Sequence, residues 1–289
     1  MNDVPTFSER LSRRQRVWWQ KPRNYRDPRT YTDFVHQLRE RNVLRSQFDA
    51  DERWRCCRYW QRSLSNKWNA RQFAERHGLR VPELYWHGRN LSRLDIDALP
   101  ECFVIRPTFG HSRQGVFVVC NGVNLLSGAK VSRRDVMQAL GGRAKRLLMG
   151  PVLVEEFVGE TPPDARLPLE LKLHMFHERV GAVSRTERSS AKGQTRVRFY
   201  TASWEPLPDP ISLRNPQADP VPAPSCLPEL LRAGKRLGQA YGTYVRVDFL
   251  VKDNKLVFGE FATTPGGSWT AFAEEYFGRL WQETLPEAL

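Results

Sequence analysis

The segment VRVDFLVKDNKLVFGEF, residues 245–261, constrains the fold most, because two strand-like runs flank a short polar turn. If the turn has three residues, 253–255, then Asp248 lies directly opposite Glu260 on the same face of a hairpin. A turn of two residues would shift this pairing by one. The segment therefore predicts two antiparallel strands and, with the longer turn, a close pair of carboxylates.

Two carboxylates at such positions repel each other, because cross-strand neighbours are only about 5 Å apart. A divalent cation shared by Asp248 and Glu260 would offset this repulsion, and Mg²⁺ is commonly held by one or two carboxylates together with substrate phosphates. Arg246 could neutralise the pair without a metal, and both acids could instead be solvated surface residues. The residues alone leave these interpretations open.

Elsewhere the first part of the chain has helical patterns, and from residue 101 the pattern changes to short strands with a few helices between them. Apolar residues at helical spacing predict helices within 1–65, at 67–79, 132–148 and 228–242, and near the end of the chain. Short runs rich in β-branched and aromatic residues predict strands at 81–88, 102–108, 115–120, 150–158, 169–176, 179–186 and 195–204. The Pro-rich stretch 206–228 is expected to be extended.

The composition excludes several classes of protein. With 40% hydrophobic residues, the 289-residue chain can bury a core, so it is not globally disordered. No apolar stretch reaches the roughly 20 residues that span a bilayer. The first residues lack the apolar core of a secretory signal, so the chain is expected in the cytoplasm. The five cysteines include no CxxC pair and are expected to be reduced.

The formal net charge of +13 comes mostly from arginine, and residues 1–60 contribute nearly half of it. Arginine suits phosphate and carboxylate contacts, but a genome rich in Arg codons would give the same composition. The charge of the N-terminal region leaves two interpretations open, a polyanionic partner and an amphipathic helix with buried aromatic residues, and the helix is the plainer one.

A second candidate segment is FVIRPTFGHSRQGVFVV, residues 103–119, where a strand carrying Arg106 leads into a glycine-containing turn. Backbone amides of such turns can approach phosphates, and neighbouring hydroxyl and basic side chains can assist. The candidate phosphate-binding residues of the turn are Gly110, His111, Ser112 and Gly115. Many hairpin turns contain two glycines, so the turn alone does not decide between these interpretations.

Two further strands carry charged residues where apolar ones are expected. In PVLVEEFV, one of Glu155 and Glu156 faces inward if the strand is half-buried, and a buried acid needs a partner. An exposed strand end would explain the two acids equally well. Lys172 is the lone basic residue of LELKLHMF.

Taken in order, five segments resemble the ATP-grasp superfamily, and most of all its teichuronopeptide-biosynthesis (TupA-like) branch. The resemblance covers roughly residues 64–275 and rests on SNKWNARQFAERHGLRVPELY, FVIRPTFGHSRQGV, PVLVEEFV, LELKLHMF and RVDFLVKDNKLVFGEFATTPGGS. It implies two α+β lobes that enclose a nucleotide cleft, at 66–158 and 159–289, preceded by a helical basic region at 1–65.

The resemblance also implies roles for individual residues. Those implied to bind ATP are Lys67, Arg106, Gly110, His111, Ser112, Gly115, Glu155, Glu156, Phe157, Val158 and Lys172. Asp248 and Glu260 match the acidic Mg²⁺ ligands. Arg246 matches the Arg that steadies the transferring phosphoryl group, and Lys172, which matches the phosphate-binding Lys of the second lobe, is the other candidate catalytic residue. The residues expected to bind substrate are Gly266, Gly267 and Ser268, matched by the family, and Arg185 and Arg188, proposed from their charge.

This sequence departs from the family pattern at three positions. Arg106 replaces the usual Lys, Asn66 stands where an acid commonly precedes the first Lys, and Ala262 stands where related ligases often have a metal-binding Asn.

The function that the resemblance implies is an ATP- and Mg²⁺-dependent carboxylate–amine ligase acting through an acylphosphate. A small-molecule or saccharide-linked carboxylate and an amine are the expected partners, as in polysaccharide decoration or peptide-like metabolite synthesis, and nucleic acid is not. The alternatives are a kinase that phosphorylates a hydroxyl and a non-catalytic polyanion-binding protein with a degenerate grasp fold.

Overall fold

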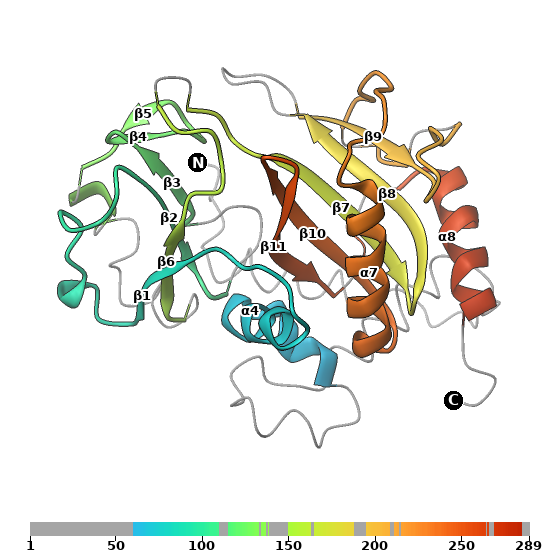
Figure 1. The fold of residues 1–289 in the computed structure, drawn as a ribbon, viewed down its shortest axis with the longest axis horizontal. Helices are drawn as coiled ribbons and strands as arrows, with labels where there is room; N and C mark the ends of the chain where they lie inside the picture. Colours follow the sequence, from blue (N-terminus) through green and yellow to red (C-terminus); the bar gives the residue numbers. More distant parts are fainter. Residues whose placement is uncertain are drawn as a thin grey trace, which may run out of the picture.

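The computed structural model describes residues 60–109, 115–132, 134–136, 138, 150–162, 165–187, 195–208, 211–213, 215–263, 265 and 269–284. Within these residues the chain forms two antiparallel sheets that lie side by side (Figure 1). Its longer helices pack against the second sheet. The α+β architecture that the family resemblance implied is confirmed.

The first sheet has six strands in the order β1-β6-β2-β3-β4-β5. Its strands are β1 Leu84–Gly88, β2 Cys102–Pro107, β3 Phe117–Cys120, β4 Val123–Asn124, β5 Ala129–Lys130 and β6 Val152–Glu156. Because β6 inserts between β1 and β2, Glu155 lies beside Arg106 although 49 residues separate them. This crossover builds one wall of the site described below.

The second sheet has five strands in the order β11-β10-β7-β8-β9. Its strands are β7 Leu169–Phe176, β8 Arg179–Glu187, β9 Arg196–Tyr200, β10 Tyr244–Lys252 and β11 Lys255–Ala262. Side chains alternate between its faces. Leu171, Leu173 and Val247 point into a fully buried core, whereas Lys172 and Asp248 point to the opposite face.

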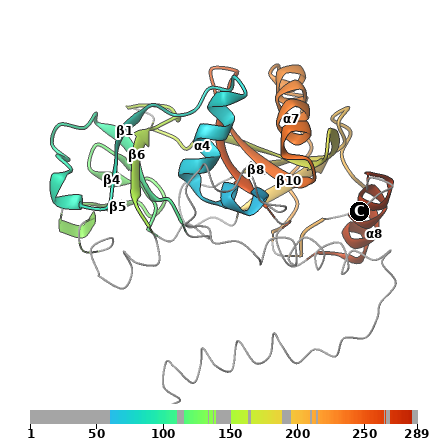
Figure 2. The same cartoon turned by 90° about the horizontal axis from the view of Figure 1, so that it is seen from below.

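Two helices cover the apolar face of the second sheet, α4 Lys67–Arg76 and α7 Leu227–Tyr241, which stand on the same side of it in Figure 2. The Asn66 side chain caps α4 by accepting a hydrogen bond of 2.9 Å from the Trp68 amide. Gly242, with a φ of 78°, ends α7 in the left-handed conformation. Burial of apolar area against the sheet is what stabilises both helices.

The remaining helices are short or peripheral. The 3₁₀ helices η1 Trp60–Ser65 and η2 Leu91–Arg93 precede α4 and follow β1. Helix α8, Ala271–Thr284, packs Phe277 and Trp281 against Phe176 and Tyr244 of the second sheet. Residues 134–136 and 138 are helical and belong to the helix predicted at 132–148.

The turn of the β10–β11 hairpin has two residues, so the three-residue turn is wrong. Lys252 pairs with Lys255, and the turn consists of Asp253 and Asn254. Both have positive φ, 51° and 58°, as tight hairpin turns of this length require.

The carboxylate pairing predicted with that turn is nevertheless correct. The register shifts by one residue between Asp248 and Phe249, where β11 accommodates Gly259 as an extra residue, and Asp248 therefore lies opposite Glu260. A Cβ on Gly259 would lie only 3.0 Å from the Asp248 carbonyl oxygen, so the bulge favours glycine.

The expectation that all cysteines are reduced is wrong for one pair. Cys102 on β2 lies directly opposite Cys120 on β3, with their Cα atoms 4.1 Å apart, and the two form a disulfide. A separation of 18 residues does not reveal this pairing, because it depends on the register of the two strands.

Other predicted elements agree in kind. The strand predicted at 195–204 ends earlier, at Tyr200, and the chain then turns. The Pro-rich stretch contains no regular helix in its described residues before α7 and contacts β9 through a bridge between Val197 and Gln217. Among the described residues, no helix is long and apolar enough to cross a membrane.

The helices predicted at the N-terminus lie almost wholly outside the described residues, which begin at residue 60. The predicted lobe boundary at 158/159 falls between the two sheets, but α4 packs on the second sheet although it precedes the first. The two-lobe division by sequence therefore stays a prediction.

Candidate active site

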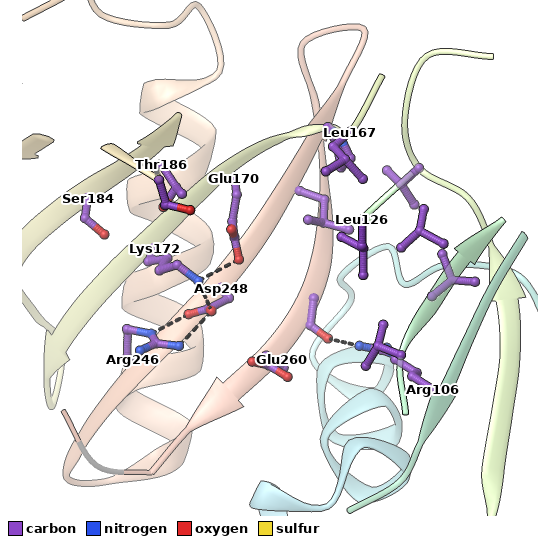
Figure 3. A pocket seen from close by; sticks show the side chains of 18 of the residues that line it. Arg106, Leu126, Leu167, Glu170, Lys172, Ser184, Thr186, Arg246, Asp248 and Glu260 are labelled. Atoms are coloured by element: carbon purple, nitrogen blue, oxygen red, sulfur yellow. Dashed lines mark hydrogen bonds and ion pairs between the residues drawn. The ribbon is translucent and has the colours of Figure 1, made fainter. Parts of the chain in front are cut away.

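A pocket of about 560 Å³ lies between the two sheets, bounded by the polar face of the second sheet (Figure 3). Three sets of side chains line it. The apolar section comprises Val104, Val118, Leu126, Phe157, Leu167 and Leu250. The charged section comprises Lys67, Arg106, Glu155, Glu170, Lys172, Arg246, Asp248 and Glu260. The third section, called aromatic here for His174, Phe199 and Trp269, also includes Ser212 and Asn215.

Asp248 is almost fully buried, and cations hold both of its oxygens. Arg246 donates from Nε to Oδ1 at 2.7 Å and from Nη2 to Oδ2 at 2.8 Å. Lys172, directly across on β7, donates from Nζ to Oδ2 at 2.5 Å and to Glu170 Oε1 at 2.6 Å. Burial alone would raise the pKa of Asp248, but the charges of Arg246 and Lys172 bring it down to about 2. Asp248 is therefore ionised, as a metal ligand must be.

Glu260 is more open than Asp248, since 39% of its side chain is exposed. Its carboxylate lies 3.9 Å from Nζ of Lys67, the first residue of α4. Burial lowers the pKa of Lys67, and the negative charge of Glu260 opposes this effect. Glu260 thus presents its carboxylate to the pocket beside a buried cation from another element.

Glu155 is the inward-facing acid of β6, with 1% exposure, and two arginines bind it. Arg106 donates from Nε to Oε2 at 2.6 Å, and Arg71 of α4 donates from Nη1 to Oε1 at 3.2 Å. Arg106 also donates from Nη1 to the Gly259 carbonyl at 3.2 Å. Arg106 therefore contacts both sheets at once.

Glu156 points to the other side of β6 and serves a different contact. It accepts a hydrogen bond of 2.7 Å from Arg80 and one of 3.1 Å from the Glu83 amide. The next residue, Phe157, is buried in a small cluster with Val118 and the disulfide pair, and this cluster supplies part of the apolar section.

His174 forms the buried edge of the aromatic section. Its Nδ1 lies 2.9 Å from the Tyr244 hydroxyl, and its ring stacks on Phe277 with centroids 5.1 Å apart. Burial, and then the positive charge of Arg246, lower the pKa of His174 to about 3. The imidazole is therefore neutral at physiological pH.

A family model described as TupA-like ATPgrasp matches residues 57–285, which include every strand of both sheets. The chain belongs to the TupA-like ATP-grasp family. The resemblance inferred from the five sequence segments is thereby confirmed.

Solved structures similar to this chain include ligases. The D-alanine–D-alanine ligase of Bacillus anthracis, solved with ATP, is 15% identical, with a TM-score of 0.50 over 77% of this chain and 66% of that one. The corresponding ligase of Helicobacter pylori is 17% identical, with a TM-score of 0.48 over 79% and 60%. This chain spans less than two thirds of either ligase. Comparison with curated protein sequences gives no match.

At such low identity the first of these ligases shows the fold alone, and it agrees with the family match. The TupA-like chain has the ATP-grasp fold that its sequence predicted, with two sheets and a pocket between them.

The structure brings most predicted site residues of this ATP-grasp protein into one pocket. Those that line it are Lys67, Arg106, Glu155, Glu156, Phe157, Val158, Lys172, Arg246, Asp248 and Glu260. Gly115, with a φ of 70°, lies next to the lining residue Val116. Gly110, His111, Ser112, Arg188, Gly266, Gly267 and Ser268 lie outside the described residues.

Arg185 is the one described candidate that the structure separates from the pocket. It alternates with Ser184 and Thr186, which line the pocket, so its side chain points to the opposite face of the sheet. There it forms an ion pair with Glu187. The pocket therefore lends no support to the predicted substrate contact of Arg185.

Sequence reasoning missed Glu170, His174, Ser184 and Thr186, all of which line the pocket. In LELKLHMF the polar residues alternate with leucines, so strand alternation alone places Glu170 and His174 on the face of Lys172. That signal was sufficient to find both residues of β7.

The carboxylate pair fits Mg²⁺ only together with phosphates. Among the described residues, no cluster of three or more His, Cys, Asp or Glu side chains is placed to hold a metal alone. Asp248 and Glu260 supply the hard oxygen donors that Mg²⁺ takes, and phosphate oxygens and water commonly complete its coordination.

Proposed function

We propose that this TupA-like protein is an ATP-dependent carboxylate–amine ligase that joins its substrates through an acylphosphate. The single observation that carries the proposal is the charged section of the pocket, where cations from both sheets and from α4 alternate with carboxylates. Such an array suits a triphosphate and its metal, and it lies between an apolar and an aromatic section.

In this proposal the nucleotide spans the first two sections. The base lies among the apolar side chains, next to Phe157 and Val158 at the end of β6. The phosphates reach Lys67, Lys172 and Arg246. Asp248 and Glu260 would hold Mg²⁺, which when bound neutralises charge on the phosphates during transfer.

The side chains of the pocket then position the substrates and stabilise the transferring phosphoryl group. A carboxylate oxygen of the acid attacks the γ-phosphorus, the bond to the bridging oxygen breaks, and ADP leaves. The amine nitrogen attacks the acyl carbon, the bond to the phosphate oxygen breaks, phosphate leaves, and the nitrogen loses a proton to solvent. Arg246, held in place by two hydrogen bonds to Asp248, is aimed to stabilise the transferring phosphoryl group.

We place the substrate other than ATP in the aromatic section. His174 and Trp269 are within aromatic contact, with ring centroids 5.9 Å apart, and His174 lies beside Arg246 in the strand register. A substrate bound there would meet the phosphoryl group next to Arg246.

The test is ATP turnover across a panel of carboxylic acids and amines, with analysis of the products. An amide together with ADP and free phosphate supports the ligase. A stable phosphate ester would show a kinase instead. No turnover and no thermal stabilisation by MgATP would favour the non-catalytic polyanion-binding protein.

Glu260→Gln is the informative variant, because Glu260 is partly exposed and its loss leaves the buried ion pairs intact. Turnover is expected to fall by at least about tenfold, as for a lost metal contact. Glu178→Gln, an exposed acid paired with Lys235 on the surface, is the matched control. Full activity in Glu260→Gln would remove the metal assignment.

A further inference from the structure

Arg106 occupies the position where the family usually has Lys. Its side chain is hydrogen-bonded to other groups of the protein, unlike a side chain that is free to bind phosphate. Its side chain is only 13% exposed. One edge of the guanidinium binds Glu155 on β6, and Nη1 binds the Gly259 carbonyl on β11. The planar guanidinium presents its N–H donors in fixed directions from separate nitrogens, whereas the ammonium of a lysine is a single point charge on a flexible stem.

The Glu155 end of this link is fixed. Glu155 is fully enclosed, and its other oxygen binds Arg71, which in turn contacts Glu75 and the Pro82 carbonyl. Truncating or moving a group in such a buried charge network is costly, because the remaining charges stay desolvated. Arg106 is therefore anchored to a rigid point of the first sheet.

The other end meets the second sheet at its bulge. The Gly259 carbonyl belongs to the same planar peptide group as the Glu260 amide. A hydrogen bond to this carbonyl therefore orients the backbone amide of Glu260. The bulge also sets the register that places Asp248 opposite Glu260.

We propose that Arg106 is a positioning residue, a link between the two sheets that fixes the Gly259–Glu260 peptide and so places the Glu260 carboxylate for Mg²⁺. The inference rests on the proposed nucleotide and magnesium site. It assigns Arg106 and Glu155 a joint task, in place of separate contacts to phosphate and adenine.

Arg106→Lys is the first test, because it keeps the charge and loses the fork. In the ligand-free protein, hydrogen exchange of the peptide covering residues 256–262 is expected to become about tenfold faster, the effect of one lost hydrogen bond to a charged group. Exchange in α7 is expected to stay unchanged. Arg179→Lys, which alters only a surface pair with Glu283, is the matched control.

The second readout is magnesium. Thermal shift at saturating ATP is followed while free Mg²⁺ is titrated, and Arg106→Lys is expected to raise the half-saturating Mg²⁺ concentration about tenfold. The same substitution in a Glu260→Gln background is expected to add little, because the link then has no carboxylate to place. A weaker affinity for ATP at every Mg²⁺ concentration, additive with Glu260→Gln, would instead make Arg106 a plain phosphate ligand.

Glu155→Asp gives an independent variant if Arg106→Lys fails to fold. It keeps the charge but shortens the anchor, and faster exchange is expected at 256–262 on the opposite sheet. Unchanged exchange there in either folded variant overturns the proposal. Since exchange needs no ligand, a protein that does not bind MgATP fails the proposed function and still tests the link.

Discussion

At the scale of single residues, the two carboxylates of the pocket differ in what they do for the fold. Asp248→Asn is expected to lower the free energy of unfolding by about 3–5 kcal/mol, because Arg246 and Lys172 lose the carboxylate that pairs them in the interior. Glu260→Gln is expected to cost less than about 1 kcal/mol, since its ionic contact with Lys67 is long, at 3.9 Å, and its side chain is partly exposed. Urea unfolding measures both, and equal losses would contradict this account.

His174 predicts a pH dependence of stability. Its folded pKa of about 3 lies below the ordinary value of 6.5, so between these values the unfolded chain binds a proton that the folded protein does not. Stability is therefore lost as pH falls below 6.5, by up to about 1.4 kcal/mol per pH unit. His174→Gln is expected to flatten the loss between pH 6 and pH 4.5 in urea unfolding. Parallel curves for the two proteins would show that His174 does not cause it.

At the scale of elements, the bulge of β11 should resist a side chain. Gly259→Ala brings a Cβ within 3.0 Å of the Asp248 carbonyl oxygen, so the two strands must shift by a few tenths of an ångström. We expect a loss of about 1 kcal/mol in stability and a weaker response to Mg²⁺ in thermal shift. Asn254→Gly, at the turn of the same hairpin, is the control and should cause neither, because the turn requires a positive φ.

The elements also show how far sequence alone reaches. Local alternation predicted the strands, and it contained enough to place Glu170 and His174 beside Lys172. It did not give the pairing of Arg106 with Glu155, which depends on β6 inserting next to β2. The Asp248–Glu260 pair was predicted with the wrong turn, and the glycine inside β11 was the available sign of a bulge.

At the scale of the whole molecule, the pocket should require a metal before it accepts a triphosphate. Its charged section holds four cations and four carboxylates among the described residues, so it has no net positive charge with which to hold a triphosphate. MgATP at a hundred times its dissociation constant is expected to raise Tm by about 5 °C or more. ATP with EDTA should produce a much smaller rise, and an equal rise would show that the cations suffice alone.

The disulfide between Cys102 and Cys120 closes residues 102–120, which include Arg106 and Gly115, into a covalent ring. A peptide bond broken inside that ring, for example by trypsin after Arg113, leaves a single connected molecule. The nicked protein should migrate as the intact chain on a gel without reductant and as two fragments with it. Strands β2 and β3 would thus stay tethered after cleavage of the backbone that joins them.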